Sequence, residues 1–140
     1  MKLHNFVTYD EVEFRPGPYL NMILGPNGTG KSSIACAICL GLGFPPSVRV
    51  FRSGINLHSP ISFQILGRAT ELSAFVKHGH KEAYIEIELK GRARGKNIII
   101  RRKLFSNKNK SEFTLNGEDS TMTKVTKKRS ELNVQIGNLW

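Results

Sequence analysis

Eight residues near the N-terminus have the types and spacing of a phosphate-binding loop. Gly25 to Ser32 (GPNGTGKS) follow the pattern of a glycine, four further residues and then Gly-Lys-Ser. Glycines allow backbone torsions that are closed to other residues, so successive N–H groups can turn inward around a β-phosphate. Lys31 would then reach the β- and γ-phosphates, and the Ser32 hydroxyl would ligate Mg²⁺. The pattern therefore predicts a site for a nucleoside triphosphate with Mg²⁺.

Such a loop needs a strand before it and a helix after it. Leu20 to Leu24 is a short, mostly apolar run of the kind that a buried parallel strand requires. Ser33 to Leu42 has apolar residues at helical spacing and ends at Gly43, a residue typical of helix C-termini. The alternative is a glycine-rich turn before an ordinary helix. The Lys-Ser pair in the first helical turn argues against that alternative.

The rest of the chain is rich in strand signals. Alternation in Met1 to Phe14 predicts a hairpin, with its turn at 8–10, which Arg15 to Pro18 ends. Further strands are predicted at 83–89, 97–104 and 112–115, the last followed by the turn pair Asn116-Gly117. The other expected segments are a loop at 45–65, a short helix at 69–77, a helix from Thr121 or Thr123 to Leu132, and a strand at 134–136. At 140 residues these elements make one α/β domain.

Composition indicates an intracellular protein with a polyanionic partner. The chain is 39% hydrophobic with a net charge of +10, and nucleic acid is the first partner that such an excess suggests. No apolar run approaches the ~20 residues of a membrane span, and the first residues lack the apolar centre of a secretory signal. Cys36 and Cys39 lie in the expected helix without a second ligand pair for zinc. We therefore expect buried thiols in a reducing compartment.

One basic segment, residues 90–110, could contact nucleic acid. Its hairpin tip and the strand after it carry the candidate residues Arg92, Arg94, Lys96, Arg101, Arg102 and Lys103. A solvated hairpin face is the ordinary explanation of such a run, but no acidic residues compensate these charges within the segment up to Lys110. Both interpretations stay open on the sequence.

Hydrolysis by a phosphate-loop protein needs a second carboxylate at the end of a distant apolar strand. No such carboxylate is visible: Ile98-Ile99-Ile100 is followed by Arg101, and the acids of 83–89 alternate along their strand. We therefore expect the chain to bind nucleotide without turning it over unaided, which leaves its status as an enzyme open.

The residues around the loop resemble a known family. Asn21 to Ser33 followed by Cys39 to Gly43 is similar to the N-terminal head segment of structural maintenance of chromosomes (SMC) proteins, most of all the fifth eukaryotic member. Shorter stretches extend the resemblance over nearly the whole chain: 66–69, 75–79, 86–89, 133–136 and 138–139.

The resemblance implies the N-terminal lobe of an ABC-type ATPase head with a mixed or antiparallel sheet, in which two heads enclose two ATP molecules. It places Asn27 to Ser33 on the phosphates and Arg68 at a DNA-sensing position. It implies as partners DNA, a C-terminal lobe of the same protein, a sixth-subunit-type SMC protein and non-SMC subunits, in the nucleus and on chromosomes. It also implies that the chain stops before the glutamine loop, coiled coil, hinge, signature motif and catalytic strand. The nucleotide-binding set is then Gly25, Pro26, Asn27, Gly28, Thr29, Gly30, Lys31, Ser32 and Ser33.

Two other functions remain as alternatives: a small phosphate-loop kinase or transferase, and a stand-alone nucleic-acid-binding module with a degenerate loop. Strand-rich sequence after the loop argues against the first, and the intact Lys31-Ser32 pair argues against the second.

The stretch from Val48 to Gln64 looks foreign to this pattern, because its removal restores the spacing that the resemblance implies. Every valine codon begins with GT and one glutamine codon is CAG, as at the ends of an intron. An unspliced intron translated in frame and a genuine loop insertion are both compatible with the sequence.

Overall fold

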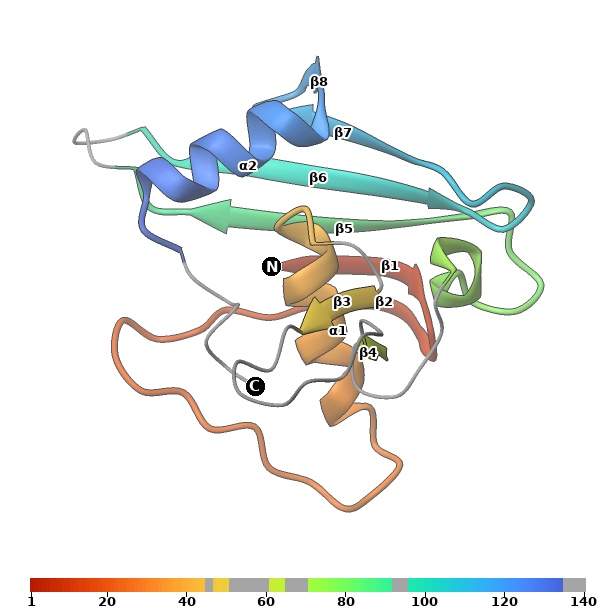
Figure 1. Cartoon of the computed structure of the whole chain (residues 1–140). Coiled ribbons are helices and arrows are strands. Elements are labelled where there is room, and N and C mark those ends of the chain that lie inside the picture. The colour runs from red at the N-terminus through yellow and green to blue at the C-terminus, as the bar shows by residue number, and fades with distance from the viewer. Residues whose placement is uncertain (45–46, 51–60, 65–70, 92–95, 135–140) are drawn as a thin grey trace.

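The structure is a computed structural model that describes residues 1–44, 47–50, 61–64, 71–91 and 96–134. Its elements in chain order (Figure 1) are β1 (Lys2–Phe6), β2 (Tyr9–Glu13), α1 (Lys31–Gly41), β3 (Ser47–Val50), β4 (Ile61–Gln64), the 3₁₀ helix η2 (Leu72–Phe75), β5 (Glu82–Leu89), β6 (Ile98–Phe105), β7 (Ser111–Leu115), β8 (Glu118–Ser120) and α2 (Met122–Glu131).

Six of the strands form one antiparallel sheet in the order β2-β1-β5-β6-β7-β8. Alternation along the strands sends every second residue to one face, which explains why the period-two runs in the sequence became β5 and β6. Asn116 and Gly117 both have positive φ in the turn between β7 and β8, as a tight hairpin turn requires. The three strands and the turn predicted for this region are confirmed.

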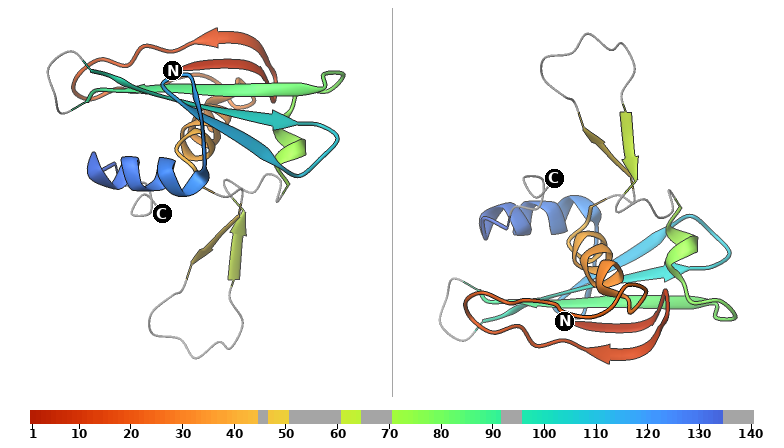
Figure 2. Two further views of the ribbon diagram at one scale, coloured as in Figure 1. Left: turned by 90° about the horizontal axis from the view of Figure 1, so that it is seen from above. Right: turned by 90° about the horizontal axis from the view of Figure 1, so that it is seen from below.

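Both α-helices pack on the same face of this sheet (Figure 2). The core lies between them and the strands, where Phe6, Leu40, Ile85, Ile100 and Leu104 are fully buried. Thr121 caps α2, as predicted, by accepting a hydrogen bond from the Lys124 N–H at 3.4 Å. Helix α2 therefore begins directly after β8.

Helix α1 ends in a Schellman motif. Gly43 has φ 83°, its N–H donates to the Leu40 carbonyl at 3.1 Å, and the Phe44 N–H donates to the Cys39 carbonyl at 3.1 Å. The glycine-rich helix end predicted from the sequence is confirmed. Cys36 and Cys39 are both buried, and burial raises the pKa of the Cys39 thiol.

The strand expected at Leu20 to Leu24 is absent. Residues 14–26 have no regular structure, and Tyr19, Leu20, Met22 and Leu24 are 91%, 89%, 72% and 79% exposed. A parallel strand is buried only when strands pair with both its edges, and no described strand pairs with this run (Figure 1). The prediction of a buried strand was therefore wrong for this chain alone.

The region expected to be a loop contains a second, two-stranded antiparallel sheet. Strand β3 pairs with β4, and Ser47 lies opposite Gln64 in the register. Pairing brings the two ends of the predicted insert, 48–64, beside each other, and the ribbon stands away from the main sheet (Figure 2). Such a hairpin can be added to a connection without rerouting the chain on either side.

Two smaller expectations need correction. The short helix predicted for 69–77 is only the four-residue η2, and Val134 lies in no strand. The remainder of the strand predicted at 134–136 falls outside the described residues. In the part of the chain that the structure describes, none of the helices is long and apolar enough to cross a bilayer.

Candidate nucleotide-binding site

The loop from Gly25 to Gly30 leads directly into α1. Gly28 and Gly30 have φ 88° and 90°, left-handed values that favour glycine, so the spacing of the glycines meets a backbone requirement. Thr29 Oγ1 donates to the Pro26 carbonyl at 2.8 Å and closes the loop on itself. The first turn of α1 carries no acidic residue, so the partial positive charge of this helix N-terminus is available to an anion.

Lys31 lies across the mouth of this loop. Its ammonium group donates to the carbonyls of Gly25 and Pro26, each at 2.5 Å. A phosphate oxygen is a stronger acceptor for an ammonium group than a neutral carbonyl, because the bond is then charge-assisted at both ends. The lysine can therefore exchange these two contacts for contacts to a polyphosphate without leaving the loop.

The two serines after Lys31 differ in exposure. Ser32 is exposed in the first turn of α1, where its hydroxyl can reach a cation beside a bound phosphate. Ser33 is fully buried, and its hydroxyl has no hydrogen-bond partner among the described residues. An unsatisfied buried hydroxyl at the base of the loop fits a ligand that would supply an acceptor.

The loop residues therefore fit a polyphosphate, while Mg²⁺ would have only Ser32 from this chain. No group of three or more His, Cys, Asp or Glu side chains in the described ranges could hold a metal ion. Mg²⁺ usually keeps several waters and uses substrate phosphates as ligands, so one protein ligand does not exclude it.

Tyr9 contacts the loop from the main sheet. The Tyr9 hydroxyl, at the start of β2, donates to the Gly30 carbonyl at 3.2 Å. Sequence reasoning missed this residue and placed it only in a hairpin turn. No local pattern could have found it, since the contact joins two segments 21 residues apart.

The structure removes Arg102 from the predicted DNA contacts. It is 2% exposed because its side chain points into the core, where Nη1 donates to the Leu40 and Phe44 carbonyls at 2.8 and 2.9 Å. Its guanidinium also lies over the Phe113 ring at 4.9 Å. Burial lowers its pKa to about 10, so it stays charged at neutral pH. Arg102 holds the end of α1 to the sheet.

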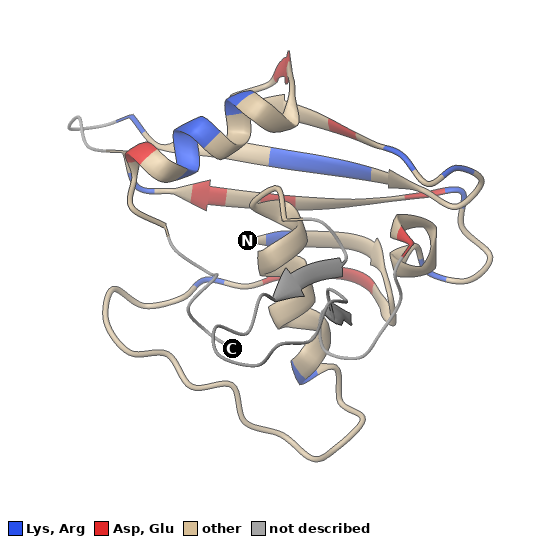
Figure 3. Ribbon diagram, in the orientation of Figure 1, with Lys and Arg blue, Asp and Glu red and all other residues tan. Residues whose placement is uncertain are grey.

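The two residues beside Arg102 on β6, Arg101 and Lys103, face solvent, but acidic residues on β5 neutralise their charges. Arg101 pairs with Glu86 at 2.5 Å, and Lys103 pairs with Glu82 at 2.7 Å. Figure 3 shows basic positions on β6 and acidic positions on the adjacent β5. The segment itself contains no acids, as the sequence shows, but the adjacent strand supplies them. Arg68, Arg92 and Arg94 lie outside the described residues.

Basic residues without acidic partners gather on α2, which sequence reasoning did not select. Lys124 and Lys127 are exposed and form no ion pair with a described residue, whereas Lys128 pairs with Glu131 at 2.9 Å. The spacing of three and four residues puts these lysines on one helical face. That spacing could have predicted a basic helical face from the sequence.

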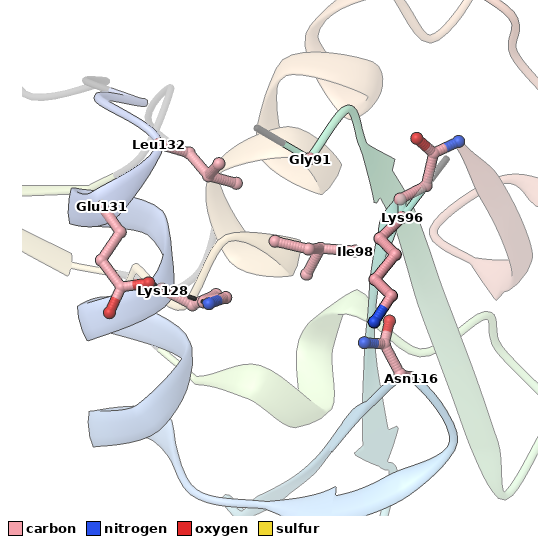
Figure 4. A pocket seen from close by; sticks show the side chains of 8 residues that line it. Gly91, Lys96, Ile98, Asn116, Lys128, Glu131 and Leu132 are labelled. Atoms are coloured by element: carbon pink, nitrogen blue, oxygen red, sulfur yellow. Dashed lines mark hydrogen bonds and ion pairs between the residues drawn. The ribbon is translucent and has the colours of Figure 1, made fainter. Parts of the chain in front are cut away.

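A cavity of about 350 Å³ lies beside α2 (Figure 4). Lys128 and Leu132 line it from the helix, and Lys96, Ile98 and Asn116 line it from the sheet. None of the residues from Gly25 to Ser33 takes part. Of the predicted DNA-contact residues, Lys96 alone reaches this cavity within the described parts of the chain.

Comparison with known proteins identifies the family of this chain. The family described as "AAA domain" matches residues 1–138, so the chain belongs to that family. Within it the chain matches the N-terminal head segment of structural maintenance of chromosomes protein 5. The Schizosaccharomyces pombe protein of that name is 44% identical over 139 residues, which are 99% of this chain and 11% of the relative. The chain thus spans about a ninth of the relative's length.

Two solved structures share the fold. A chain solved in work on ATP-driven dimerization and DNA-stimulated activation of SMC ATPases has a TM-score of 0.68 and 22% identity, and the match covers 96% of this chain and 78% of that one. An Smc head domain with an extended coiled coil, bound to the C-terminal domain of ScpA from Pyrococcus furiosus, has a TM-score of 0.73 and 22% identity. That match covers 96% of this chain and 32% of the other. The antiparallel lobe with its phosphate loop therefore has the fold of the N-terminal lobe of an SMC head.

Proposed function

We propose that residues 1–140 bind ATP and Mg²⁺ as half of an SMC-type head that acts on DNA in repair, recombination and chromosome maintenance. The observation that carries the proposal is the loop with two left-handed glycines, whose lysine lies over its mouth at the N-terminus of a helix. Lys31 would hold the β- and γ-phosphates, Ser32 the Mg²⁺, and the first N–H groups of α1 the phosphate oxygens. Bound Mg²⁺ would neutralise charge on the phosphates.

The exposed run from Tyr19 to Leu24 supports a C-terminal lobe of the same protein as the missing partner. Its backbone is not paired by any described strand, and its apolar side chains are mostly in water. A lobe that supplies strands on both edges would convert it into the buried strand that its sequence predicts. Hydrolysis then requires that lobe and a second head of the sixth-subunit type, and non-SMC subunits are further expected partners.

DNA binding, in the nucleus and on chromosomes, is the second part of the proposal. The contact set is now Arg68, Arg92, Arg94, Lys96, Arg101 and Lys103, without Arg102. Replacing Arg92, Arg94 and Lys96 together should flatten the salt dependence of duplex binding, since each phosphate contact steepens the slope by about 0.9. An unchanged salt dependence would mean that the hairpin at 90–96 is an ordinary solvated surface that does not contact DNA.

The central experiment is ATP binding by calorimetry with wild type, Lys31→Ala and the control Lys81→Ala. Lys81 is an exposed lysine outside the loop. A charge-assisted hydrogen bond contributes roughly 1.5–3 kcal/mol, so Lys31→Ala should weaken ATP affinity by about 10- to 100-fold. Lys81→Ala should leave it unchanged. Equal affinities in all three proteins would contradict the nucleotide site.

The alternative of a small kinase has no specific support in the structure. Such an enzyme alternates helices with parallel strands, whereas every strand pair in the described sheet is antiparallel.

A further inference from the structure

Tyr9 and Gly30 are fitted to each other at the point where the loop becomes a helix. Gly30 has φ 90°, and a Cβ added to it would lie 2.4 Å from the Tyr9 hydroxyl and 2.9 Å from the ring carbon that carries it. Only a residue without a side chain can therefore sit against Tyr9. The hydroxyl also donates to the Gly30 carbonyl, which accepts the first helical bonds from the N–H groups of Ser33 and Ile34 at 2.9 and 3.3 Å.

The turn that presents Tyr9 is itself held in an uncommon conformation. Val7 has φ 53°, a left-handed value that is rare for a β-branched residue and persists only where the surroundings enforce it. Its N–H donates to the Phe75 carbonyl at 2.9 Å, and the Lys77 N–H donates to the Asn5 carbonyl at 2.7 Å. The Lys77 ammonium also pairs with Asp10 at 2.5 Å, on the residue after Tyr9. Three contacts from 75–77 therefore fix the turn.

We propose that Tyr9 is a positioning residue for the phosphate loop. Its hydroxyl fixes the orientation of the peptide that joins Gly30 to Lys31, and that orientation sets the direction of the Lys31 N–H group in the loop that would bind a phosphate. The inference rests on the proposed nucleotide site and adds a residue outside the loop motif. A loop held in its binding conformation loses less conformational entropy when it binds, so the tyrosine raises affinity without touching the ligand.

The same contacts join the loop to the segment 75–77. A displacement of that segment moves the β1–β2 turn, and with it the ring that packs against Gly30. Nucleotide affinity in this chain therefore depends on a segment that contributes nothing to the phosphate-binding pattern itself.

The test compares wild type, Tyr9→Phe and the control Tyr84→Phe. Tyr9→Phe removes one hydroxyl and keeps the ring, so the packing against Gly30 remains. Tyr84 lies on β5 with its ring stacked on His4, and the structure gives its hydroxyl no hydrogen bond to a described residue. Two ligands, ATP and inorganic triphosphate, are titrated by calorimetry at a temperature where each variant is folded.

Tyr9→Phe should weaken both ligands by about two- to tenfold, the range for one neutral hydrogen bond. The factor should be the same for both ligands, because Gly30 faces phosphate and not the nucleoside. Amide resonances of Gly30 and Lys31 should shift in the ¹⁵N spectrum of Tyr9→Phe recorded without ligand, and Tyr84→Phe should change neither measurement.

The possible failures are distinguishable. If wild type binds ATP and Lys31→Ala does not, but Tyr9→Phe binds like wild type, the positioning role is overturned and the nucleotide site stands. If wild type itself binds neither ligand, the proposed function fails. Unshifted Gly30 and Lys31 resonances would refute the Tyr9 contact regardless of binding, and a lowered melting temperature with unchanged affinity would mean a structural role only.

Discussion

Replacing Arg102 by methionine should destabilise the fold and leave DNA binding intact. Methionine keeps an unbranched, flexible side chain but has no donors, so the Phe44 carbonyl would lose the partner that Arg102 now supplies, and Ser111 Oγ would lose its bond from Arg102 Nε at 3.0 Å. The Leu40 carbonyl would keep its bond from the Gly43 N–H. An unsatisfied buried acceptor costs roughly 1–3 kcal/mol. The gain from no longer burying a cation, visible as the lowered pKa of about 10, offsets part of this loss.

We therefore expect the free energy of unfolding to fall by about 2 kcal/mol, to be measured by urea denaturation with circular dichroism. In a domain of this size such a loss lowers the melting temperature by about 5–10 °C. Arg101→Met is the matched control on the same strand. Its ion pair with Glu86 is half exposed, and exposed pairs contribute at most about 1 kcal/mol.

DNA affinity should distinguish Arg101 from Arg102 in the opposite direction to stability. Arg101→Met should weaken duplex binding, since Arg101 is among the proposed contacts, whereas folded Arg102→Met should bind DNA like wild type. A normal unfolding curve together with weakened DNA binding in Arg102→Met would refute the assignment of this arginine to the core.

Three further predictions follow from the described geometry. The chain alone should show no steady-state ATP hydrolysis in a phosphate-release assay, and robust turnover would contradict the need for a second lobe. The hydrogen bond and charge of Lys77 hold the pKa of Asp10 below its usual 3.8, so this pair stabilises the fold above that pH, and the stabilisation disappears as pH falls through the lowered value. Lys77→Met should therefore lose less stability than wild type on acidification below about pH 4, as measured by circular dichroism. Equal losses in the two proteins would exclude the pair. Deleting 48–64 should leave ATP affinity and melting temperature unchanged, because the two ends of the segment are paired side by side. Transcript sequencing decides the origin of the segment: reads that skip its codons would identify an unspliced intron, and uniform coverage would identify a true insertion.

Local pattern was sufficient for most of the sheet. The period-two runs, the Asn116-Gly117 turn and the threonine cap of α2 are each decided by neighbours in sequence, so they could be predicted. The alternation of Ile98, Ile100 and Leu104 also puts Arg102 on the inner face, which was a signal that the charge of the segment concealed.

What could not be predicted depends on distant partners. The acids that neutralise Arg101 and Lys103 belong to another strand, and only the register of β5 against β6 brings them opposite. Tyr9 meets Gly30 through the tertiary fold. The apolar run at Leu20 to Leu24 has the composition of a strand, but a buried strand also needs neighbours, and no described strand pairs with it.

That run has a consequence for the synthesis of a longer protein. The segment Tyr19 to Leu24 (YLNMIL) has no charge and no proline. On the proposed pairing, its partner strands belong to the far end of a protein several times longer, and at roughly 5–20 residues per second they arrive on the order of minutes later. During that interval an extended apolar segment with unpaired backbone groups is open to other nascent chains. On that proposal, the same exposure that lets the lobe accept its partner would make the unfinished polypeptide dependent on chaperones for its solubility.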